Sequence, residues 1–258
     1  MAVTIDLTDA NSDGVGVDIA AYFADFNQSF DMTGWGHFSG NPFDFSGNNY
    51  AGTNGSGLLP FISDSAQSFV VDSGSAGDVN YSLGTHQLSG SVDGVSFGHG
   101  LNYSSSSDSF SHTTTDIGIT GLGITGSGAG NPVHDLVYGL MKNNTSALEA
   151  QLSANDLVIN GSDGADSIQG YAGDDTLTGN GGDDIFVFAT GSGNDTITDL
   201  TVGDKIDVYD AWNGVTEFAD LIIDYASDVG NAIISIAGAT DTITVEGYSS
   251  GLDDGFFV

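Results

Sequence analysis

Cysteine and basic residues are what this sequence most clearly lacks. There is no cysteine among its 258 residues, so no disulfide can stabilise the fold, and thiols do not define its redox compartment. Lys142 and Lys205 are the only lysine or arginine residues, against 35 aspartates and glutamates, and the formal net charge is -33. This charge argues against nucleic acid or an anionic membrane as a partner and favours cations. A salt-adapted surface explains the same charge and is compatible with cation binding.

Long apolar segments are missing as well. The first residues, MAVTIDLTDANSDG, lack the basic and apolar regions of a cleavable secretory signal, and no apolar run is long enough to span a bilayer. We therefore expect a soluble protein. If it is exported, we expect a route that does not read an N-terminal signal.

The composition changes near residue 153, which predicts one domain over residues 1–153 and a second over 154–258. In the first part, apolar and polar residues alternate between turns rich in glycine, serine and asparagine. The pairs Phe69 with Val71 and Ile117 with Ile119 are examples. Such alternation predicts an antiparallel sheet.

Three segments of the first part carry helix signals. One begins at Ile19, where apolar residues follow helical spacing. A second starts behind Asn131 as N-cap with Pro132 as its first residue, and a third opens at Ser146, whose spacing to Glu149 is that of a capping box. Helices together with antiparallel strands predict an α+β domain.

The second part contains a nine-residue repeat. GSDGADSIQ, GYAGDDTLT and GNGGDDIFV follow one another, TGSGNDTIT comes after two inserted residues, and all approximate G-G-x-G-x-D-x-U-x, where U is a large apolar residue. Glycines permit sharp turns, and the aspartates supply the oxygen ligands that calcium prefers. A flexible linker would have no reason to keep an apolar residue two positions after each aspartate. The residues that we expect at calcium sites are Gly161, Asp163, Asp166, Gly170, Asp174, Asp175, Gly179, Asp183, Asp184 and Asp195.

These units resemble the RTX calcium-binding repeats of proteins exported by bacterial type I secretion, which form a parallel β-roll. The final DDGFFV resembles the acidic-then-apolar end of uncleaved type I secretion signals. The resemblance implies a secreted, extracellular protein that is handled by the type I secretion machinery. Because calcium is plentiful outside the cell and binds only the folded state, we expect the roll to fold after export.

A tyrosine and a histidine lie on either side of a short turn in DVNYSLGTHQLSG. If Gly84-Thr85 is a two-residue hairpin turn, Tyr81 pairs with Leu88, and Tyr81 and His86 are diagonal neighbours on one face. An imidazole that accepts the phenolic proton increases the phenolate character of the tyrosine, and tyrosinate is a known axial ligand of haem. An ordinary cross-strand pair of a polar and an aromatic side chain is the other interpretation of these two residues.

The block GDVNYSLGTHQLSGSVDGVSFGHGL, followed by TDIGITGLGI and NPVHDLVYGLMKNNTSALEAQL, resembles the HasA-type hemophores, which are secreted haem-acquisition proteins of Gram-negative bacteria. The resemblance covers roughly residues 18–152. It implies an α+β fold with helices packed on a curved antiparallel sheet, and ferric haem b held between two loops. It also implies that Tyr81 is an axial ligand with His86 as its partner, in a turn that is shorter than in those hemophores. The implied partners are an outer-membrane receptor and, as haem sources, other haemoproteins.

The resemblance implies His37, in TGWGHFSGN, as the second axial ligand, although some relatives bind through tyrosine alone. Among the other histidines, His134 lies on the apolar side of its helix, and we interpret it as structural. We expect His99 and His112 to be exposed, and they are the fallback ligands if His37 does not bind the iron. Four aromatic residues could cover a porphyrin face or belong to the core. They are Trp35, Phe38, Phe43 and Phe45.

GVSFG, residues 94–98, matches the G-x-S-x-G pattern of serine hydrolases, but Ser96 alternates with apolar residues as in a strand, whereas a nucleophile elbow needs a strand, a turn and a helix. No H-E-x-x-H motif is present. We therefore expect a carrier and not an enzyme. Two alternatives stay open: a calcium-stabilised secreted adhesin or matrix protein without haem, and an RTX hydrolase that uses Ser96.

Overall fold

The computed structural model describes residues 2–40, 45–54, 66–209, 212 and 214–258, and the chain forms two compact units. The first unit comprises Ala21–Gln151, and the second comprises Ala2–Ala20 together with Leu152–Val258. The expected division between residues 153 and 154 lies close to the point where the second unit resumes. That the N-terminal segment belongs with the C-terminal part of the chain was not indicated by the sequence.

The first unit contains three helices and seven strands in its described residues. The helices are α1 (Ile19–Ser29, which starts in the second unit), α2 (Pro132–Met141) and α3 (Ser146–Leu152). The strands are β3 (His37–Phe38), β4 (Ser46–Gly47), β5 (Asn49–Thr53), β6 (Gln67–Asp72), β7 (Val79–Ser82), β8 (Gln87–Ser104) and β9 (Ser109–Gly126).

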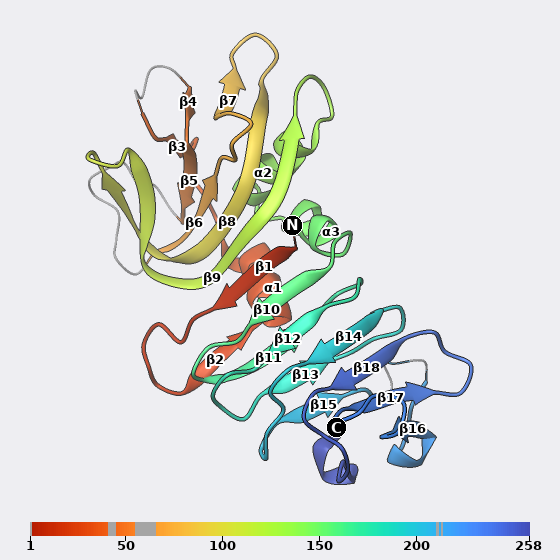
Figure 1. Cartoon of the computed structure of the whole chain (residues 1–258). Helices are drawn as coiled ribbons and strands as arrows, with labels where there is room; N and C mark the ends of the chain where they lie inside the picture. Colours follow the sequence, from red (N-terminus) through yellow and green to blue (C-terminus); the bar gives the residue numbers. More distant parts are fainter. Residues whose placement is uncertain (1, 41–44, 55–65, 210–211, 213) are drawn as a thin grey trace. The chain divides into compact units, whose positions relative to one another are not determined.

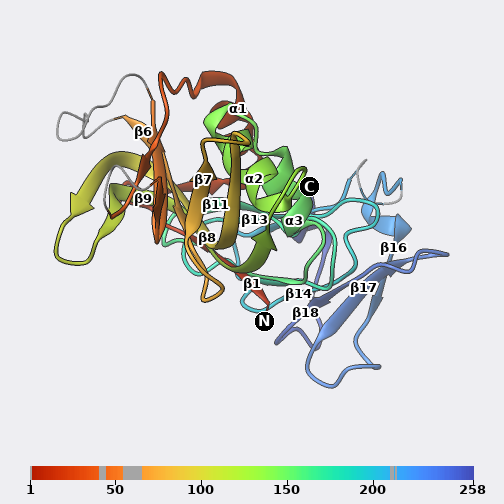
Figure 2. The same ribbon diagram turned by 90° about the horizontal axis from the view of Figure 1, so that it is seen from above.

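The strands of the first unit form an antiparallel sheet in the order β9-β8-β6-β5-β3, and β7 pairs with the beginning of β8 and with β4. The long β8 and β9 are strongly curved (Figure 1), and their pairing shifts register twice, as β-bulges do where a sheet bends. The predicted antiparallel sheet is therefore confirmed. Helix α2 packs against β8 and β9 on one side of the sheet (Figure 2).

Aromatic side chains join α1 to this sheet. Phe23 and Phe26 contact Phe97 of β8 edge to face, with ring centroids 5.5 and 5.2 Å apart. Phe97 pairs with Phe69 of β6, and all four side chains are buried. The alternation that predicted the strands therefore places Phe69 of β6 and Phe97 of β8 on the face that packs against the helix.

The predicted helix starts are largely as expected. Asn131 caps α2 by accepting the backbone N–H of His134 at 3.1 Å, and Pro132 is the first helical residue. Helix α3 begins at Ser146, but Thr145 rather than Ser146 contacts Glu149, through its hydroxyl and its carbonyl. Glu149 is therefore held by a side-chain and a helical backbone hydrogen bond to Thr145 and not by the predicted capping box with Ser146.

The second unit is built from strands with only short 3-10 helices in its described residues. Its strands are β1 (Val3–Leu7), β2 (Val15–Asp18), β10 (Leu157–Asn160), β11 (Ala165–Gln169), β12 (Thr176–Thr178), β13 (Ile185–Val187), β14 (Asn194–Ile197), β15 (Lys205–Asp207), β16 (Leu221–Asp224), β17 (Ala232–Ile236) and β18 (Thr242–Val245). The 3-10 helices are η1 (Phe218–Asp220) and η2 (Asp254–Phe256).

Successive strands of the second unit alternate between two parallel sheets. One sheet runs β1-β10-β12-β14-β18, and the other runs β2-β11-β13-β15 (Figure 1). Each pair of strands therefore makes one coil, and β1 with β2 makes the first coil. Residues 21–151, the whole first unit, are inserted between the first coil and the second. Antiparallel β16 and β17 extend the first sheet beyond β18.

The apolar residues of the repeats point between the two sheets, as predicted. Ile168, Leu177, Phe186 and Ile197 are each fully buried. The final residues also belong to this unit, since Phe257 bridges to Ile206 of β15. No helix in the described ranges is long and apolar enough to cross a membrane.

Candidate functional site

A cavity of about 720 Å³ lies in the first unit. Its volume is within the range of roughly 300–1,000 Å³ that is usual for small-molecule sites. The lining is mostly aromatic and aliphatic with a few polar groups. It consists of Trp35, Gly36, His37, Phe38, Phe45, Tyr50, Tyr81, Leu83, His86, Leu88, His134, Tyr138 and Met141.

Tyr81 and His86 meet at this cavity. The Tyr81 hydroxyl lies 2.7 Å from Nδ1 of His86. Tyr81 pairs with Leu88 as predicted, but the predicted two-residue turn is wrong: β7 ends at Ser82, and the turn comprises residues 83–86. His86 has φ of +56°, and its N–H donates to the Ser82 carbonyl at 2.8 Å. The left-handed backbone of His86 is a feature of the turn that brings its ring back to the tyrosine.

The chemistry of this pair depends on the imidazole tautomer. When Nδ1 carries no proton, it accepts the phenolic proton, and the tyrosine oxygen gains negative character. Such an oxygen is a hard, anionic donor suited to ferric iron. A tyrosine and a histidine in this arrangement can thus act as a metal ligand and its proton acceptor.

Exposed apolar side chains surround Tyr81. Trp35 is 74% exposed and Leu83 is 62% exposed, although large apolar residues usually avoid water. The rings of Trp35 and Phe45 lie 6.3 and 6.2 Å from the Tyr81 ring, measured between centroids. Phe38 also lines the cavity, whereas Phe43 lies outside the described residues. A flat apolar ligand would find covering surfaces here.

His37 lies on β3, opposite Ala51 of β5, and lines the same cavity. Its ring centroid is 6.5 Å from that of Phe110. The structure thus brings His37, Tyr81 and His86 to one cavity. The role of His37 as a second ligand stays a prediction.

Helix α2 contributes residues that the sequence did not suggest as cavity lining. His134, Tyr138 and Met141 lie on one face of α2 and line the cavity. His134 makes the contacts expected of a structural histidine, since its Nδ1 accepts the Leu88 N–H at 3.2 Å and its ring stacks on Tyr138 at 5.3 Å. The helical spacing of His134, Tyr138 and Met141 in the sequence could have revealed that they share one face of α2.

Tyr50 of β5 is a further lining residue that was missed. Its hydroxyl is buried and has no hydrogen-bond partner among the described residues, and burial raises the pKa of Tyr50 above its usual value. The group therefore stays protonated. A ligand that offered an acceptor oxygen would satisfy it.

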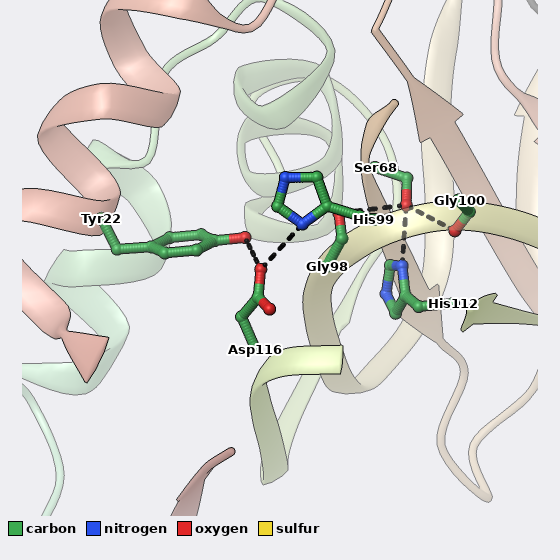
Figure 3. A network of polar contacts seen from close by, with 7 residues as sticks. All are labelled: Tyr22, Ser68, Gly98, His99, Gly100, His112 and Asp116. Carbon is green, nitrogen blue, oxygen red and sulfur yellow. Dashed lines mark hydrogen bonds and ion pairs between the residues drawn. The ribbon is translucent and has the colours of Figure 1, made fainter. Parts of the chain in front are cut away.

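His112 is not exposed, contrary to the prediction, and both of its nitrogens are occupied. Figure 3 shows Nδ1 of His112 facing the Ser68 hydroxyl, at 2.7 Å, and Nε2 lies 3.0 Å from the Ser96 hydroxyl. Burial lowers the pKa of His112 to about 4. A neutral histidine held between two hydroxyls of the sheet is a structural element, so His112 is a poor fallback ligand.

His99 is partly exposed and belongs to a neighbouring contact. Its Nδ1 lies 3.2 Å from the carboxylate of Asp116, which also accepts the Tyr22 hydroxyl at 3.0 Å (Figure 3). His99 is not among the residues that line the cavity. The two fallback histidines therefore lie together on the sheet and away from Tyr81.

Ser96 contacts His112 but does not lie on a nucleophile elbow. It sits in the middle of β8, which runs from Gln87 to Ser104 without a turn into a helix. The G-x-S-x-G match is thus a coincidence of a glycine-rich strand.

The sixth-position aspartates of the second unit are buried in the turns. Asp166, Asp175, Asp184 and Asp195 are each 1–2% exposed, and one oxygen of each accepts a backbone N–H from the preceding coil. The glycines Gly161, Gly170 and Gly179 are buried against these carboxylates, while Asp163, Asp174 and Asp183 are exposed. A Cβ atom at Gly170 or Gly179 would collide with the carboxylate of its own repeat.

A fifth buried aspartate was missed. Asp204 accepts the Asp184 N–H at 3.0 Å, in the same way as Asp184 accepts that of Asp166 at 2.8 Å. It belongs to DLTVGDKID, which starts with Asp199 where the other units have glycine or threonine. The aspartate followed two residues later by Ile206 was the signal that could have identified a fifth unit.

The buried position of these carboxylates disfavours their charged form. Burial raises the pKa of Asp175 and Asp184 to about 7 and that of Asp195 to about 6. Among the residues that the structure describes, one oxygen each of Asp175 and Asp195 is buried without a hydrogen-bond partner. Within the described ranges, however, no three histidine, cysteine, aspartate or glutamate side chains converge as a metal site. A cation would also need hydroxyl or main-chain carbonyl oxygens, as calcium commonly uses.

Known proteins are similar to part of this chain. The hemophore HasA of Serratia marcescens is 33% identical over 123 residues, which is 45% of this chain and 64% of that protein, so the chain spans less than two thirds of its length. The apo structure of the hemophore HasA from Yersinia pestis has a TM-score of 0.45 and 22% identity and covers 59% of this chain and 87% of that one. The holo structure of that hemophore has a TM-score of 0.45 and 23% identity and covers 59% and 89%.

The model of one protein family, described as heme-binding protein A (HasA), matches residues 11–192, which include every residue of the cavity lining. The matched segment is well over half of the chain. This protein therefore belongs to the heme-binding protein A (HasA) family.

Proposed function

We propose that this protein is an extracellular hemophore that binds ferric haem b in the cavity of the first unit. The observation that carries the proposal is the 2.7 Å contact between the Tyr81 hydroxyl and His86 Nδ1 at an aromatic cavity of about 720 Å³. Family membership supports haem as the ligand.

In this proposal the Tyr81 oxygen binds the iron, and His86 accepts the phenolic proton. Trp35 and Phe45, whose rings flank Tyr81, cover the porphyrin. His37 is the proposed second axial ligand, with binding through Tyr81 alone as the alternative.

Release follows from the same pair. The weaker contact of the iron, which is the proposed one with His37, breaks first. A proton that returns through His86 to the Tyr81 oxygen then neutralises the anionic ligand. Acid should therefore weaken haem binding. A haem affinity that stays unchanged down to pH 5 would contradict this mechanism.

We further propose that the second unit is a calcium-binding RTX β-roll. Buried carboxylates with unpaired oxygens and two parallel sheets linked coil by coil support this proposal. Asp166, Asp175, Asp184 and Asp195, with main-chain oxygens of the glycine-rich turns, are the proposed ligands. Calcium would neutralise charges that otherwise repel across neighbouring coils. Export by type I secretion, folding outside the cell and delivery of haem to an outer-membrane receptor complete the proposed function.

The protein is a carrier and not an enzyme, in accordance with its family. The hydrolase alternative required an activated Ser96, and Ser96 lies within a continuous strand. The adhesin alternative predicts that the protein does not bind haem.

A titration with ferric haem tests the proposal. The calcium-loaded chain and its Tyr81→Ala variant are titrated side by side while the Soret and visible bands are recorded. Tyr103→Ala is the matched control, because Tyr103 is an exposed tyrosine of the same unit that does not line the cavity. We expect one saturable site in the wild type and the control, and a shifted spectrum with at least tenfold weaker binding in Tyr81→Ala. A wild-type titration like that of free haem would overturn the proposal.

A further inference from the structure

Lys142 is the only lysine or arginine of the first unit, since Lys205, the other basic residue of the chain, belongs to the second unit. Lys142 directly follows α2 as its C-cap, its N–H donates to the Gly139 carbonyl at 2.8 Å, and its side chain is exposed. A cation at the C-terminus of a helix interacts favourably with the helix dipole, which is one role for this residue. Its surroundings indicate a second role.

Lys142 ends a row of three side chains along α2. His134, Tyr138 and Lys142 are four residues apart in the sequence, which places them on the same side of a helix. The ring of His134 stacks on that of Tyr138, with the planes 11° apart, and Nζ of Lys142 lies 5.8 Å from the centroid of the Tyr138 ring. His134 and Tyr138 both line the cavity. The row therefore leads from the cavity lining to the ammonium group of Lys142.

The charge of this ammonium group is not used within the described part of the protein. The chain has 35 aspartates and glutamates against two basic residues, yet no carboxylate of the described residues forms an ion pair with Lys142. Its contact with the Tyr138 ring is a cation–π interaction, which leaves the N–H groups free to donate to another partner. The ammonium group is therefore available to a carboxylate that comes from outside the chain.

The proposed ligand brings such carboxylates. Haem b carries propionate side chains at one edge of an otherwise apolar ring, and their carboxylates are ionised at neutral pH. The aromatic lining of the cavity suits the ring but not these charges. A carboxylate beside the buried hydroxyl of Tyr50 would lose its hydration, which is costly.

Lys142 offers a carboxylate better conditions. Because Lys142 is exposed, a carboxylate that pairs with it keeps its contact with water and avoids the desolvation cost of a buried ion pair. The rest of the first unit has no other lysine or arginine, and the net charge of -33 repels an anion. The end of α2 is therefore the place where the field of this unit is most favourable for the carboxylate edge of a ligand.

We propose that Lys142 binds a propionate carboxylate of the haem and directs the carboxylate edge of the porphyrin toward the C-terminal end of α2. Tyr81 holds the iron at the centre of the ring, and a flat apolar ring can turn about that centre. Lys142 selects one orientation, because it is the one basic residue that this unit presents to the ligand. This inference rests on the proposed haem-binding function and names the residue that recognises the carboxylates.

Titrations of the full chain with ferric haem and with its dimethyl ester, in which the carboxylates are blocked, test the assignment. Lys142→Gln removes the cation, Lys142→Arg keeps it, and Lys205→Gln is the matched control with the same loss of charge in the second unit. We expect Lys142→Gln to bind haem about two- to fivefold more weakly than the wild type at low ionic strength, and to bind the ester equally well. Lys142→Arg and Lys205→Gln should bind both ligands as the wild type does.

The other outcomes separate this inference from the proposed function. Equal weakening of haem and ester binding in Lys142→Gln would assign the residue to the helix end alone and overturn the inference. An unchanged haem affinity of Lys142→Gln would also overturn it, while haem binding through Tyr81 would stand. No binding of haem by the wild type would overturn both.

The dependence on salt gives a second readout. Salt screens an ion pair between exposed groups, so the ratio of the haem affinities of the wild type and Lys142→Gln should approach one as sodium chloride rises from about 0.02 to 0.5 M. Taking the ratio at each salt concentration removes the effect of salt on the fold, which both proteins share. A ratio that does not change with salt would contradict an ion pair at Lys142.

Discussion

The two units place their candidate ligand atoms in opposite surroundings. In the first unit, Tyr81 and His86 lie at a cavity among exposed apolar side chains and already bond to each other. In the second unit, Asp175 and Asp195 are buried in the turns, and each has an oxygen without a hydrogen-bond partner in the described part of the chain. The first arrangement suits a ligand that enters and leaves, because Tyr81 and His86 also satisfy each other by a hydrogen bond. The second suits an ion, because a buried carboxylate oxygen without a partner is costly.

The largest expected effect tests whether the N-terminal segment belongs to the second unit. Ile5 of β1 is fully buried and pairs with Ile159 of β10, so Ile5→Asp should destabilise the second unit by about 4 kcal/mol or more. Thr8→Asp, at a nearby exposed position, is the control and should change stability by less than about 0.5 kcal/mol. Chemical denaturation of the calcium-loaded chain measures both. Similar curves for the two variants would refute this division of the chain.

The next effect concerns the proton acceptor in the first unit. His86→Ala should weaken haem binding by about 10–100-fold, since loss of a hydrogen-bond partner to a metal ligand typically has this size. His99→Ala is the control, because His99 is a partly exposed histidine that contacts Asp116 and does not line the cavity. Competition for haem with apomyoglobin compares the variants. Equal haem affinities of His86→Ala and His99→Ala would show that the contact between Tyr81 and His86 has no role in haem binding.

A third test uses pH, because the stability of the two units should respond with opposite sign. The pKa of His112 is lowered to about 4 by burial, against about 6.5 in an unfolded chain, so the first unit loses stability as the pH falls from 6.5 toward 4. The pKa of Asp175 is raised to about 7, against about 3.9 unfolded, so the calcium-free second unit is most stable below pH 4. The second unit loses the stabilisation that protonated Asp175 provides as the pH rises through 7.

Amide hydrogen exchange in chelator, followed by mass spectrometry over this pH range, reads each unit separately. Protection of β8 should decrease on acidification, after correction for the intrinsic exchange rate, while protection of β12 should increase. Calcium should reverse the trend in β12, since protons compete with calcium for the same carboxylates. The same trend in both strands without calcium would contradict the comparison.

The smallest expected effect tests the structural role of the His112 contacts. Ser96→Ala removes one hydrogen bond to His112 and should lower the free energy of unfolding by about 1 kcal/mol without changing haem affinity. Ser105→Ala, in an exposed turn of the same unit, should have no measurable effect. Urea denaturation compares the two. A change in the haem affinity of Ser96→Ala would contradict a purely structural role for the contact between Ser96 and His112.

Local patterns were sufficient for much of the structure. Alternation identified β6 and β9, and Asn131-Pro132 identified the start of α2, because these signals depend on neighbouring residues. Local patterns do not predict contacts between residues that are far apart in the sequence. The pairing of β1 with β10 joins residues about 150 positions apart, and nothing in MAVTIDL distinguishes a strand of one unit from a strand of the other.

The site was predicted to a similar extent. The hairpin argument brought Tyr81 near His86, although the turn has four residues and depends on a left-handed His86. The polar contacts of His112 were not foreseen, because Ser68 and His112 come from different strands. Asp204 was missed because its unit, DLTVGDKID, lacks glycine at the first, second and fourth positions of the repeat pattern.

The most direct test of the central claim is resonance Raman spectroscopy of the ferric haem complex. The account predicts vibrations of an iron-bound tyrosinate in the wild type and in His37→Ala, and their loss in Tyr81→Phe, which keeps the ring and removes only the oxygen. Unchanged spectra in Tyr81→Phe, or the absence of a tyrosinate signal in the wild type, would contradict it.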